Sequence, residues 1–400
     1  MRDAPRSLAL PRGFRDILPT EARELHAIQR LLMGTFASYG YVPLEPPTVE
    51  LAPSAIDERR LLRFVDRDGR LLALRPDVTT AVARVVAQRY REVDGALRLS
   101  YFTPIFREEA SMRGSEREYD QAGIELIGVA GALADVEAIA VLADALERCG
   151  LSGAEVDVGH VGFLRGFLTD LPEGAREAAG EAARRGDLVA VLAAARDGGL
   201  SAGRCAALGR GLRYRGPGEF TEIRRDAPGA AAAALGELES LEPLLDAAGV
   251  GAAIRFDLGF VPALSYYTGV VFQVTAPDLG FAIAAGGRYD GFLARFGTDL
   301  PATGFGIAVP HLHQAVVAAG WRAADDAPLV VLLPSSDDVA TLLVATALRR
   351  AGLPVAIGEA AETAGRPTLR ARAVDETHIE YEGVTRALDA FVAVLTGTPA

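Results

Sequence analysis

The chain has 400 residues, of which 50% are hydrophobic and 24% are charged, and its formal net charge is −12. This length and composition predict a soluble globular protein with a sizeable core, arranged as one large domain with a small appendage or as two to three modules. The acidic balance argues against a broad nucleic-acid-binding face, which needs a basic surface.

Hydropathy and cysteine content indicate where in the cell the protein is expected. No run of about 18 residues is apolar without charge, glycine or proline, so we expect neither membrane insertion nor export. Cys149 and Cys205 have no partner at a spacing typical of a disulfide framework or a metal site. These features predict a cytoplasmic protein in a reducing environment.

The N-terminal part predicts one helix and then an extended segment. Apolar residues recur at three- and four-residue spacing over Thr20–Tyr39, where Thr20 can cap the helix. The following stretch, Gly40–Glu50, is rich in proline. Because proline cannot donate to a sheet ladder, this stretch is not a central strand over its full length.

A short strand over Leu71–Arg75 precedes a helix over Thr79–Tyr90, with a turn between them. A carboxylate or hydroxyl at such a place often serves only as a helix cap. In the alternative interpretation, Asp77 and Thr79 lie at the edge of a sheet and face a ligand. The sequence leaves both interpretations open.

The central stretch, Phe102–Gly128, predicts a β-hairpin with one apolar and one polar face. Apolar and polar residues alternate on both sides of a loop at Ala110–Glu116, which is the period of a strand. A solvated sheet face gives the same alternation. Gly123 favours the floor of a small-molecule site instead, because a strand glycine often marks a close approach of ligand or backbone. The polar face carries Arg107, Glu109, Arg117, Gln121 and Glu125.

The remaining pattern predicts an α+β fold built on an antiparallel sheet flanked by helices, with a helical insertion at about 162–250. Strands that reach a sheet through hairpins, with helices on one side, favour this architecture over a doubly wound parallel sheet. A helix is expected at Asp135–Cys149, and strands are expected at Ala154–His160, Ile254–Leu258, Val270–Val274 and Phe281–Ala284. A turn at Gly286–Gly287 follows, and then the segment Thr303–Ala319.

The C-terminal part predicts a small α/β module after a linker at Asp325–Pro328. The apolar run VVLLP, a helix at Asp337–Arg350 and a strand at Leu353–Ile357 form a β-α-β pattern. A further strand is expected at His378–Tyr381 and a helix at Thr385–Leu395. We therefore expect a core domain over residues 1–324 and the module over 325–400.

Four motifs in order carry a resemblance to a known family. The hairpin contains F-R-x-E, R-x-Y-x-Q and G-x-E-x-x-G, and three more stretches are LRPDVTTAVAR, LSYYTGVVFQ and AAGGRYDGFL. Together they resemble class II aminoacyl-tRNA synthetases of the histidyl type. The resemblance implies that fold, a homodimer with Gly40–Glu50 at its interface, and an amino-acid pocket. The implied histidine-binding residues are Asp77, Thr79, Arg107, Gln121, Glu125, Tyr266 and Tyr267.

That set of side chains suits histidine, since carboxylates and an amide match its ammonium and imidazole, an arginine matches its carboxylate, and aromatic rings pack around it. The synthetase family usually has Glu where Asp77 stands. Tyr266 and Tyr267 can also be only a core and an interface aromatic.

The residues for adenylate formation depart from the synthetase pattern. That reaction needs cations against phosphate charge, yet Pro262 replaces one expected arginine, and Pro310 and His311 replace the Glu-Arg pair of the third motif. Ala110, Ser111 and Ser115 likewise replace the expected residues of the motif 2 loop. His311 and His313 are not expected to bind metal, because they diverge on a helix and lack a third ligand.

A sequence that keeps the histidine-binding residues but lacks those for adenylate formation resembles the family of ATP phosphoribosyltransferase regulatory subunits. This implies a non-catalytic chain without cofactor or tRNA, which joins a short-form catalytic subunit, is required for the first step of histidine biosynthesis, and mediates feedback inhibition by histidine. Two alternatives stay open, a divergent histidyl-tRNA synthetase and a histidine sensor with another partner.

Overall fold

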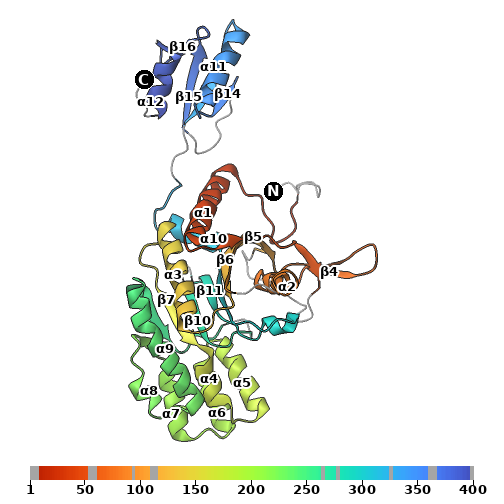
Figure 1. Ribbon diagram of the computed structural model, residues 1–400, viewed down its shortest axis with the longest axis vertical. Coiled ribbons are helices and arrows are strands. Elements are labelled where there is room, and N and C mark those ends of the chain that lie inside the picture. Colours follow the sequence, from red (N-terminus) through yellow and green to blue (C-terminus); the bar gives the residue numbers. More distant parts are fainter. Residues whose placement is uncertain are drawn as a thin grey trace, which may run out of the picture. The chain divides into compact units, whose positions relative to one another are not determined.

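The computed structural model describes residues 9–52, 61–91, 95–108, 116–262, 266–275, 280–323, 328–358 and 367–396 (Figure 1). The chain forms two compact units. The larger contains Ile28–Trp321 with the segment that ends at Arg15, and the smaller contains Asp16–Ala27 with the chain from Arg322 onward. The expected boundary at residue 324 lies outside the described residues.

A nine-stranded sheet forms the centre of the larger unit, in the order β1-β5-β6-β12-β11-β10-β7-β9-β8. All neighbours are antiparallel except β1 with β5 and β7 with β9. The predicted α+β architecture is therefore confirmed. The strands are β1 (Val42–Pro43), β5 (Leu97–Phe106), β6 (Glu118–Ile127), β7 (Val156–His160), β8 (Arg215–Gly216), β9 (Ile254–Asp257), β10 (Val270–Thr275), β11 (Ala282–Arg288) and β12 (Ala302–Ala308).

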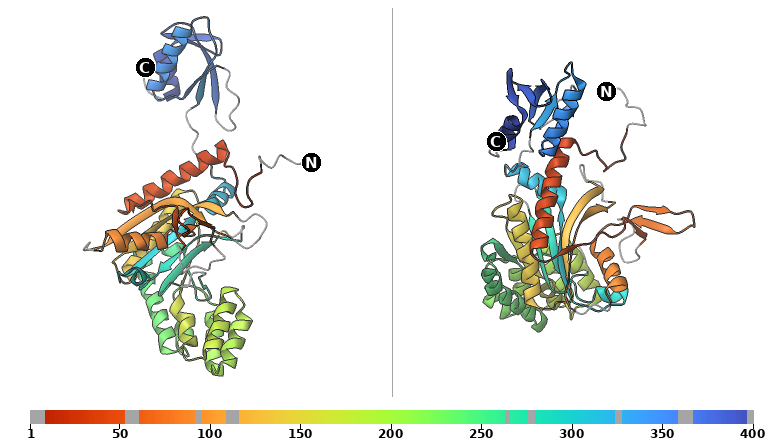
Figure 2. Two further views of the ribbon diagram at one scale, coloured as in Figure 1. Left: turned by 90° about the vertical axis from the view of Figure 1, so that its right-hand side faces the viewer. Right: turned by 45° about the horizontal axis from the view of Figure 1, so that its top comes forward.

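Helices cover both faces of this sheet (Figures 1 and 2). On one face, α3 (Ala132–Arg148) and α10 (Val309–Ala318) pack on β6 and β12, and α1 (Pro19–Ser38) places Phe36 edge-on to Phe305 at 5.9 Å. On the other face, α2 (Thr79–Arg89) and the short helix η4 (Leu293–Phe296) enclose a core that includes Val82, Tyr101 and Val271. This second face carries the predicted site.

The stretch predicted as a helical insertion folds as helices α4–α9, drawn in green in Figure 1. A short helix, η3 (Gly251–Ala253), returns the chain to β9. Within the described residues, no helix is long and apolar enough to cross a membrane. The bounds are α4 (Val161–Leu168), α5 (Glu173–Arg184), α6 (Leu188–Asp197), α7 (Ala202–Gly211), α8 (Thr221–Arg224) and α9 (Gly229–Ala247).

The turn predicted at Gly286–Gly287 is wrong, since both residues lie inside β11. A Cβ on Gly287 would stand 2.5 Å from the carbonyl oxygen of Val270, and one on Gly286 would stand 2.4 Å from that of Gly304. The pair is glycine because neighbouring backbones approach closely, which is the other common reason for glycine in a strand.

A separate three-stranded sheet follows β1, in the order β2-β4-β3. Its strands are β2 (Val49–Leu51), β3 (Arg63–Val65) and β4 (Leu71–Leu74), and both pairs are antiparallel. The hairpin of β3 and β4 extends away from the nine-stranded sheet (Figure 1). Strand β4 leads directly to Arg75 and α2.

The smaller unit contains a five-stranded sheet in the order β14-β13-β15-β16-β17. Its own core includes Val330, Val344, Ile379 and Phe391. The predicted β-α-β pattern is present, since β13 and β14 are parallel and α11 connects them. The elements are β13 (Leu329–Leu332), α11 (Asp338–Arg350), β14 (Val355–Ile357), β15 (Thr368–Ala373), β16 (His378–Tyr381), β17 (Val384–Ala387) and α12 (Leu388–Thr396).

The helix predicted at Thr385–Leu395 begins later than expected. Glu382 and Gly383 both have positive φ, of 52° and 75°, and form a two-residue hairpin turn. That turn places Thr385 opposite Glu380 in the sheet, so the chain is a strand until Ala387.

Candidate functional site

The carboxyl group of Glu125 lies at the centre of the site. Glu125 is on β6 and only 1% exposed. Its Oε1 accepts a hydrogen bond of 2.7 Å from the Thr79 hydroxyl, and its Oε2 accepts one from the Tyr289 phenol. Burial raises the pKa of Glu125 to about 8, an effect that these two hydrogen bonds oppose. The site therefore contains a carboxyl whose charge depends on what lies beside it.

Glycines on the neighbouring strand make room for the polar side chains of β6. Gly304 of β12 pairs with Glu125, and a Cβ there would stand 2.3 Å from Glu125 Oε2. Gly306 pairs with Gly123, and its Cβ would stand 2.5 Å from the Gln121 amide nitrogen. The Glu125 and Gln121 side chains thus extend across a surface without side chains. This surface is the floor of the site.

Gly123 does not itself leave a gap for a ligand. A Cβ at this position would stand 2.1 Å from the Phe305 carbonyl oxygen and 2.5 Å from the Tyr101 hydroxyl. Tyr101 donates to that same carbonyl at 3.3 Å. The glycine is needed because a tyrosine from β5 lies over it, so the space is filled by protein.

Asp77 and Thr79 make different contacts at the start of α2, and both interpretations of these residues stay open. Asp77 is 8% exposed, and its Oδ1 accepts a hydrogen bond of 2.8 Å from the Thr80 backbone NH, so it caps the helix. Its charge also raises the pKa of Glu125, which places it close to that carboxyl. Thr79 faces the site, because its hydroxyl donates to Glu125. The Asp77 charge therefore acts on the Glu125 carboxyl.

Aromatic rings form one wall of the site. The ring centroid of Tyr266 lies 4.8 Å from that of Tyr267, 5.7 Å from that of Tyr289 and 4.8 Å from that of Phe292. Burial raises the pKa values of Tyr266 and Tyr267, so both phenols are neutral hydrogen-bonding groups. Tyr267 is also part of the buried core and Tyr266 packs against it, so both alternatives for this tyrosine pair stay open.

Arg107 is the predicted cation of the site. Its Nε donates 2.8 Å to the Pro76 carbonyl oxygen, and its charge lowers the pKa of Tyr267, so it lies near the aromatic wall. Arg117 lies elsewhere, with its guanidinium against the Phe14 ring and on the Arg12 carbonyl. The predicted Glu109 and the replaced loop residues Ala110, Ser111 and Ser115 lie outside the described residues.

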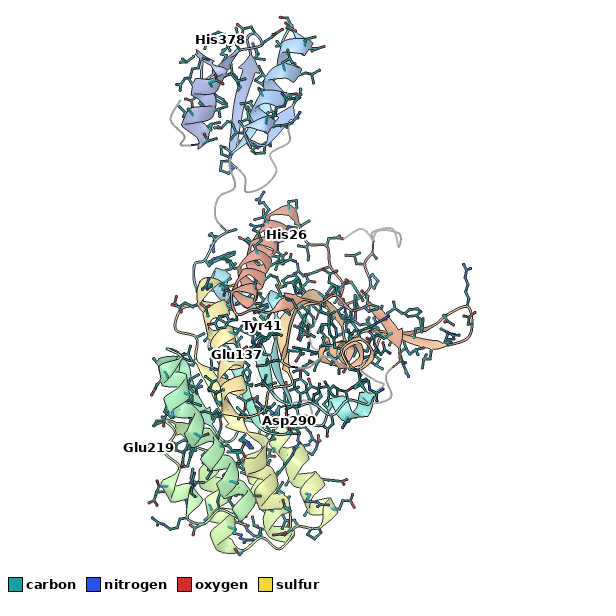
Figure 3. All side chains as sticks on the ribbon, viewed as in Figure 1. His26, Tyr41, Glu137, Glu219, Asp290 and His378 are labelled. Atoms are coloured by element: carbon teal, nitrogen blue, oxygen red, sulfur yellow. The ribbon has the colours of Figure 1, made fainter. Side chains whose placement is uncertain are left out.

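Sequence reasoning missed one site residue of the motif AAGGRYDGFL, Tyr289. Tyr289 binds Glu125 directly, and Arg288 beside it is buried. The Arg288 guanidinium forms an ion pair of 2.9 Å with Asp135 and also contacts Asp290, which is labelled in Figure 3. Because β11 was expected to end before the glycines, the following tyrosine was not placed on the sheet.

The positions expected to face phosphate groups carry no arginine. His311 is in α10, where its Nδ1 lies 2.8 Å from the Ala282 carbonyl oxygen and its ring lies 4.2 Å from that of Phe281. Pro262 has no charge. No group of three or more His, Cys, Asp or Glu side chains among the described residues is arranged to hold a metal ion.

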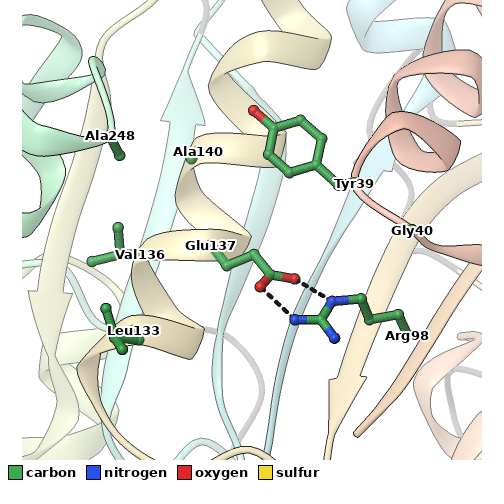
Figure 4. A pocket seen from close by; sticks show the side chains of 8 residues that line it. All are labelled: Tyr39, Gly40, Arg98, Leu133, Val136, Glu137, Ala140 and Ala248. Carbon is green, nitrogen blue, oxygen red and sulfur yellow. Dashed lines mark hydrogen bonds and ion pairs between the residues drawn. The ribbon is translucent and has the colours of Figure 1, made fainter.

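A hollow of about 620 Å³ lies on the opposite, α3 side of the sheet (Figure 4). Leu133, Val136 and Ala140 of α3 line it, and the Arg98 guanidinium forms a two-bond ion pair of 2.7 Å with Glu137 at its edge. Since that pair satisfies both charges, the hollow offers no unpaired charge to a ligand. The Glu125 side of the sheet therefore remains the candidate for the small-molecule site.

The chain matches the family model described as histidyl-tRNA synthetase over residues 13–312. An ATP phosphoribosyltransferase regulatory subunit from Moorella thermoacetica is 38% identical over 376 residues, which are 92% of this chain and 95% of that protein. One from an Anaeromyxobacter species is 42% identical over 327 residues, which are 79% of this chain and 95% of that protein.

Two solved structures are similar over most of the chain. One from Bacillus halodurans, described as an ATP phosphoribosyltransferase regulatory subunit/histidyl-tRNA synthetase, has a TM-score of 0.82 at 29% identity and covers 92% of this chain and 99% of its own. The histidyl-tRNA synthetase from a Nostoc species has a TM-score of 0.77 at 19% identity, and the match covers 98% of this chain and 99% of that protein. At that identity the second shows the fold alone.

Proposed function

This chain belongs to the family of ATP phosphoribosyltransferase regulatory subunits, and from that premise we propose that it is a non-catalytic cytoplasmic subunit that binds L-histidine and regulates a short-form catalytic subunit. The catalytic subunit would carry out the phosphoribosyl transfer that begins histidine biosynthesis. Histidine bound to this chain would then lower that activity, as feedback inhibition. No cofactor and no tRNA take part in this proposal.

One observation carries the proposal, namely the buried Glu125 carboxyl beside Asp77 and within an aromatic wall. A buried carboxyl that also feels the charge of Asp77 favours a ligand with positive charge, because an unpaired buried charge is costly. Histidine supplies an ammonium group and an imidazole that can donate hydrogen bonds. Arg107 is available on the same side for the ligand carboxylate.

A divergent histidyl-tRNA synthetase is the rival enzyme function. It would need cations around ATP phosphates at the ends of β12 and of the Tyr266 segment. Pro262 and His311 stand there, and the His311 ring is held against Phe281 and a backbone carbonyl. The pocket therefore favours binding of the amino acid over its activation.

The decisive experiment titrates histidine into the complex of this chain with a short-form catalytic subunit while phosphoribosyltransferase activity is measured. Glu125→Ala and Asp77→Ala should each weaken inhibition roughly ten- to a hundredfold, because each leaves the ammonium group poorly paired. Glu219→Ala, in the exposed part of the insertion (Figure 3), is the matched control. Unchanged inhibition in both site variants would place the regulatory histidine on the catalytic subunit.

A further inference from the structure

An N-terminal segment lies beside the open end of the β5-β6 hairpin. Residues 11–15, which we call the strap, belong to the same compact unit as the histidine site. Strand β12 pairs with β6 only from Gln121 onward, so the earlier residues of β6 pair with β5 alone among the described strands. The strap begins to cover that edge, because the Gly13 carbonyl oxygen accepts a hydrogen bond of 2.8 Å from the Arg117 backbone NH.

The side chain of Arg117 holds the strap at further points. Its guanidinium donates a hydrogen bond of 3.2 Å to the Arg12 carbonyl oxygen and lies 5.8 Å from the centroid of the Phe14 ring. Gly13 lies against the stem of the same side chain. Its φ is 79°, and a Cβ there would stand 2.5 Å from Arg117 Cγ. Both the left-handed backbone and the close contact therefore favour glycine at this position.

Arg117 also contacts the chain at Arg107, the predicted cation of the site. The Arg117 carbonyl oxygen accepts a hydrogen bond of 2.9 Å from the Arg107 backbone NH, and the Arg117 guanidinium forms an ion pair with Glu108. Arg107 directly follows β5, and Arg117 directly precedes β6, so these are the last contacts in the described part of the hairpin. The strap is therefore connected to the backbone of Arg107 through one residue, Arg117.

The Arg107 side chain extends from this backbone position toward the site. Its Nε donates a hydrogen bond of 2.8 Å to the carbonyl oxygen of Pro76, the residue before Asp77. Both Nη groups make no hydrogen bond to the described residues, so they can form the two-bond contact that a guanidinium makes with a carboxylate. Because that contact requires both groups to be aligned, a shift of the Arg107 backbone should weaken it.

We propose that the strap and Arg117 position Arg107 for the ligand carboxylate, and thereby determine how strongly the site prefers L-histidine over an amine with the same imidazole but no carboxylate. This inference rests on the proposed function, in which Arg107 binds that carboxylate. Arg117 acts here as a positioning residue, because its own guanidinium is held by the strap and by Glu108. A purely structural role would instead change the affinity for both ligands alike.

The groups proposed to bind the positive part of the ligand are held by other contacts. Glu125 accepts hydrogen bonds from Thr79 and Tyr289. Asp77 caps α2. A displaced strap should therefore leave these groups in place. Histamine has the imidazole and the amine of histidine but no carboxylate, so its affinity reports on these groups. The ratio of the histidine and histamine affinities then isolates the contact between Arg107 and the carboxylate.

The test measures the affinity of the full chain for L-histidine and for histamine by isothermal titration calorimetry. The wild type should prefer histidine roughly ten- to a hundredfold, because histamine lacks the charge-assisted contact. Gly13→Ala should lower this ratio at least about fivefold and leave the histamine affinity within about twofold. Gly153→Ala is the matched control and should change neither affinity, because Gly153 has a φ of 76° and an added Cβ would meet no other heavy atom within 4 Å.

Further variants cover the case in which Gly13→Ala does not fold. Arg117→Ala removes the guanidinium that contacts the strap and Glu108, and it should lower the ratio to a similar extent. Arg107→Ala should abolish the preference and so defines the largest possible effect. Hydrogen–deuterium exchange gives a readout without any ligand. The Arg107 amide should exchange at least about tenfold faster in Gly13→Ala and Arg117→Ala than in the wild type.

Each outcome decides one step. An unchanged ratio in Gly13→Ala and Arg117→Ala, or an equal loss of both affinities, would overturn the positioning role. An unchanged ratio in Arg107→Ala would overturn the contact between this arginine and the carboxylate, and the positioning role with it. A wild type that binds no histidine would overturn the proposed function, whereas the exchange rate of the Arg107 amide would still decide whether the strap holds this residue.

Discussion

Tyr289 donates a hydrogen bond to the carboxyl group of Glu125, although the two residues are 164 positions apart in the chain. Glu125 is on β6 and Tyr289 directly follows β11, with β12 between them in the sheet. The contact spans β12 because Gly304 of that strand has no side chain. Glu125 is thus held in place by the sheet topology and not by neighbours in sequence.

Removal of the Tyr289 phenol should weaken histidine binding about tenfold. The hydrogen bond from Tyr289 lowers the pKa of Glu125, so Tyr289→Phe leaves more of the carboxyl protonated at neutral pH and less able to pair with an ammonium group. Isothermal titration calorimetry measures the affinity. Tyr214→Phe, in the helical insertion, is the control, and an equal loss in both variants would show a general effect on folding.

The raised pKa of Glu125 predicts a specific dependence of stability on pH. Its folded pKa of about 8 lies above the model value of 4.5, so the folded state binds more protons between these values. Stability from this group is present below pH 4.5 and is lost as the pH rises through 8, at up to about 1.4 kcal/mol per pH unit. Glu125→Gln cannot titrate. Urea unfolding at several pH values should show that the free energies of unfolding of the wild type and Glu125→Gln depend differently on pH. The same pH dependence in both proteins would contradict the raised pKa of Glu125.

Histidine binding should release a proton for the same reason. An ammonium group beside Glu125 favours the ionised carboxyl, so at about pH 7 close to one proton leaves per histidine bound. Calorimetry in two buffers of different ionisation enthalpy counts this proton. Glu125→Gln should release none, and an equal count in both proteins would assign the proton to another group.

Alternation along the hairpin was enough to predict which β6 side chains share a face, because the strand period is two and depends only on local sequence. It could not show that Gly123 is filled by Tyr101, since that contact joins β5 to β6 and to the Phe305 carbonyl of β12. The role of Tyr289 was hidden for a similar reason. Two consecutive glycines are typical of a turn, and only the register of β10, β11 and β12 shows that they are required by close strands.

Isolated protein should form no histidyl-adenylate. The cations expected against ATP phosphates are replaced by Pro262 and His311, and the loss of such charge stabilisation costs orders of magnitude in rate. Histidine-dependent exchange of pyrophosphate into ATP is the measurement, with a histidyl-tRNA synthetase as the positive control. Exchange above background would support the rival enzyme function.

Arg288 should be important for stability rather than for ligand binding. It pairs with Asp135 at 2.9 Å with side-chain exposures of 9% and 4%, and it also donates to the Gly131 carbonyl at 3.0 Å before α3. Removing one partner of a buried pair leaves the other charge unpaired, so Arg288→Ala should lower the free energy of unfolding by about 3 to 5 kcal/mol. Arg185→Ala removes the exposed pair with Glu181 and should lower the free energy of unfolding much less in the same urea titration.

A chain that ends at Ala324 should keep histidine binding and association with the catalytic subunit. The smaller unit has its own core around Val344 and Phe391, and none of the proposed site residues lies beyond Tyr289. The Anaeromyxobacter relative matches over 95% of its own length but over only 79% of this chain, so about a fifth of this chain has no matched counterpart in that relative. Calorimetry with histidine and co-purification with the catalytic subunit test the truncated chain. If the truncated chain aggregates, or loses binding of histidine or of the catalytic subunit, the C-terminal unit is an integral part of the fold.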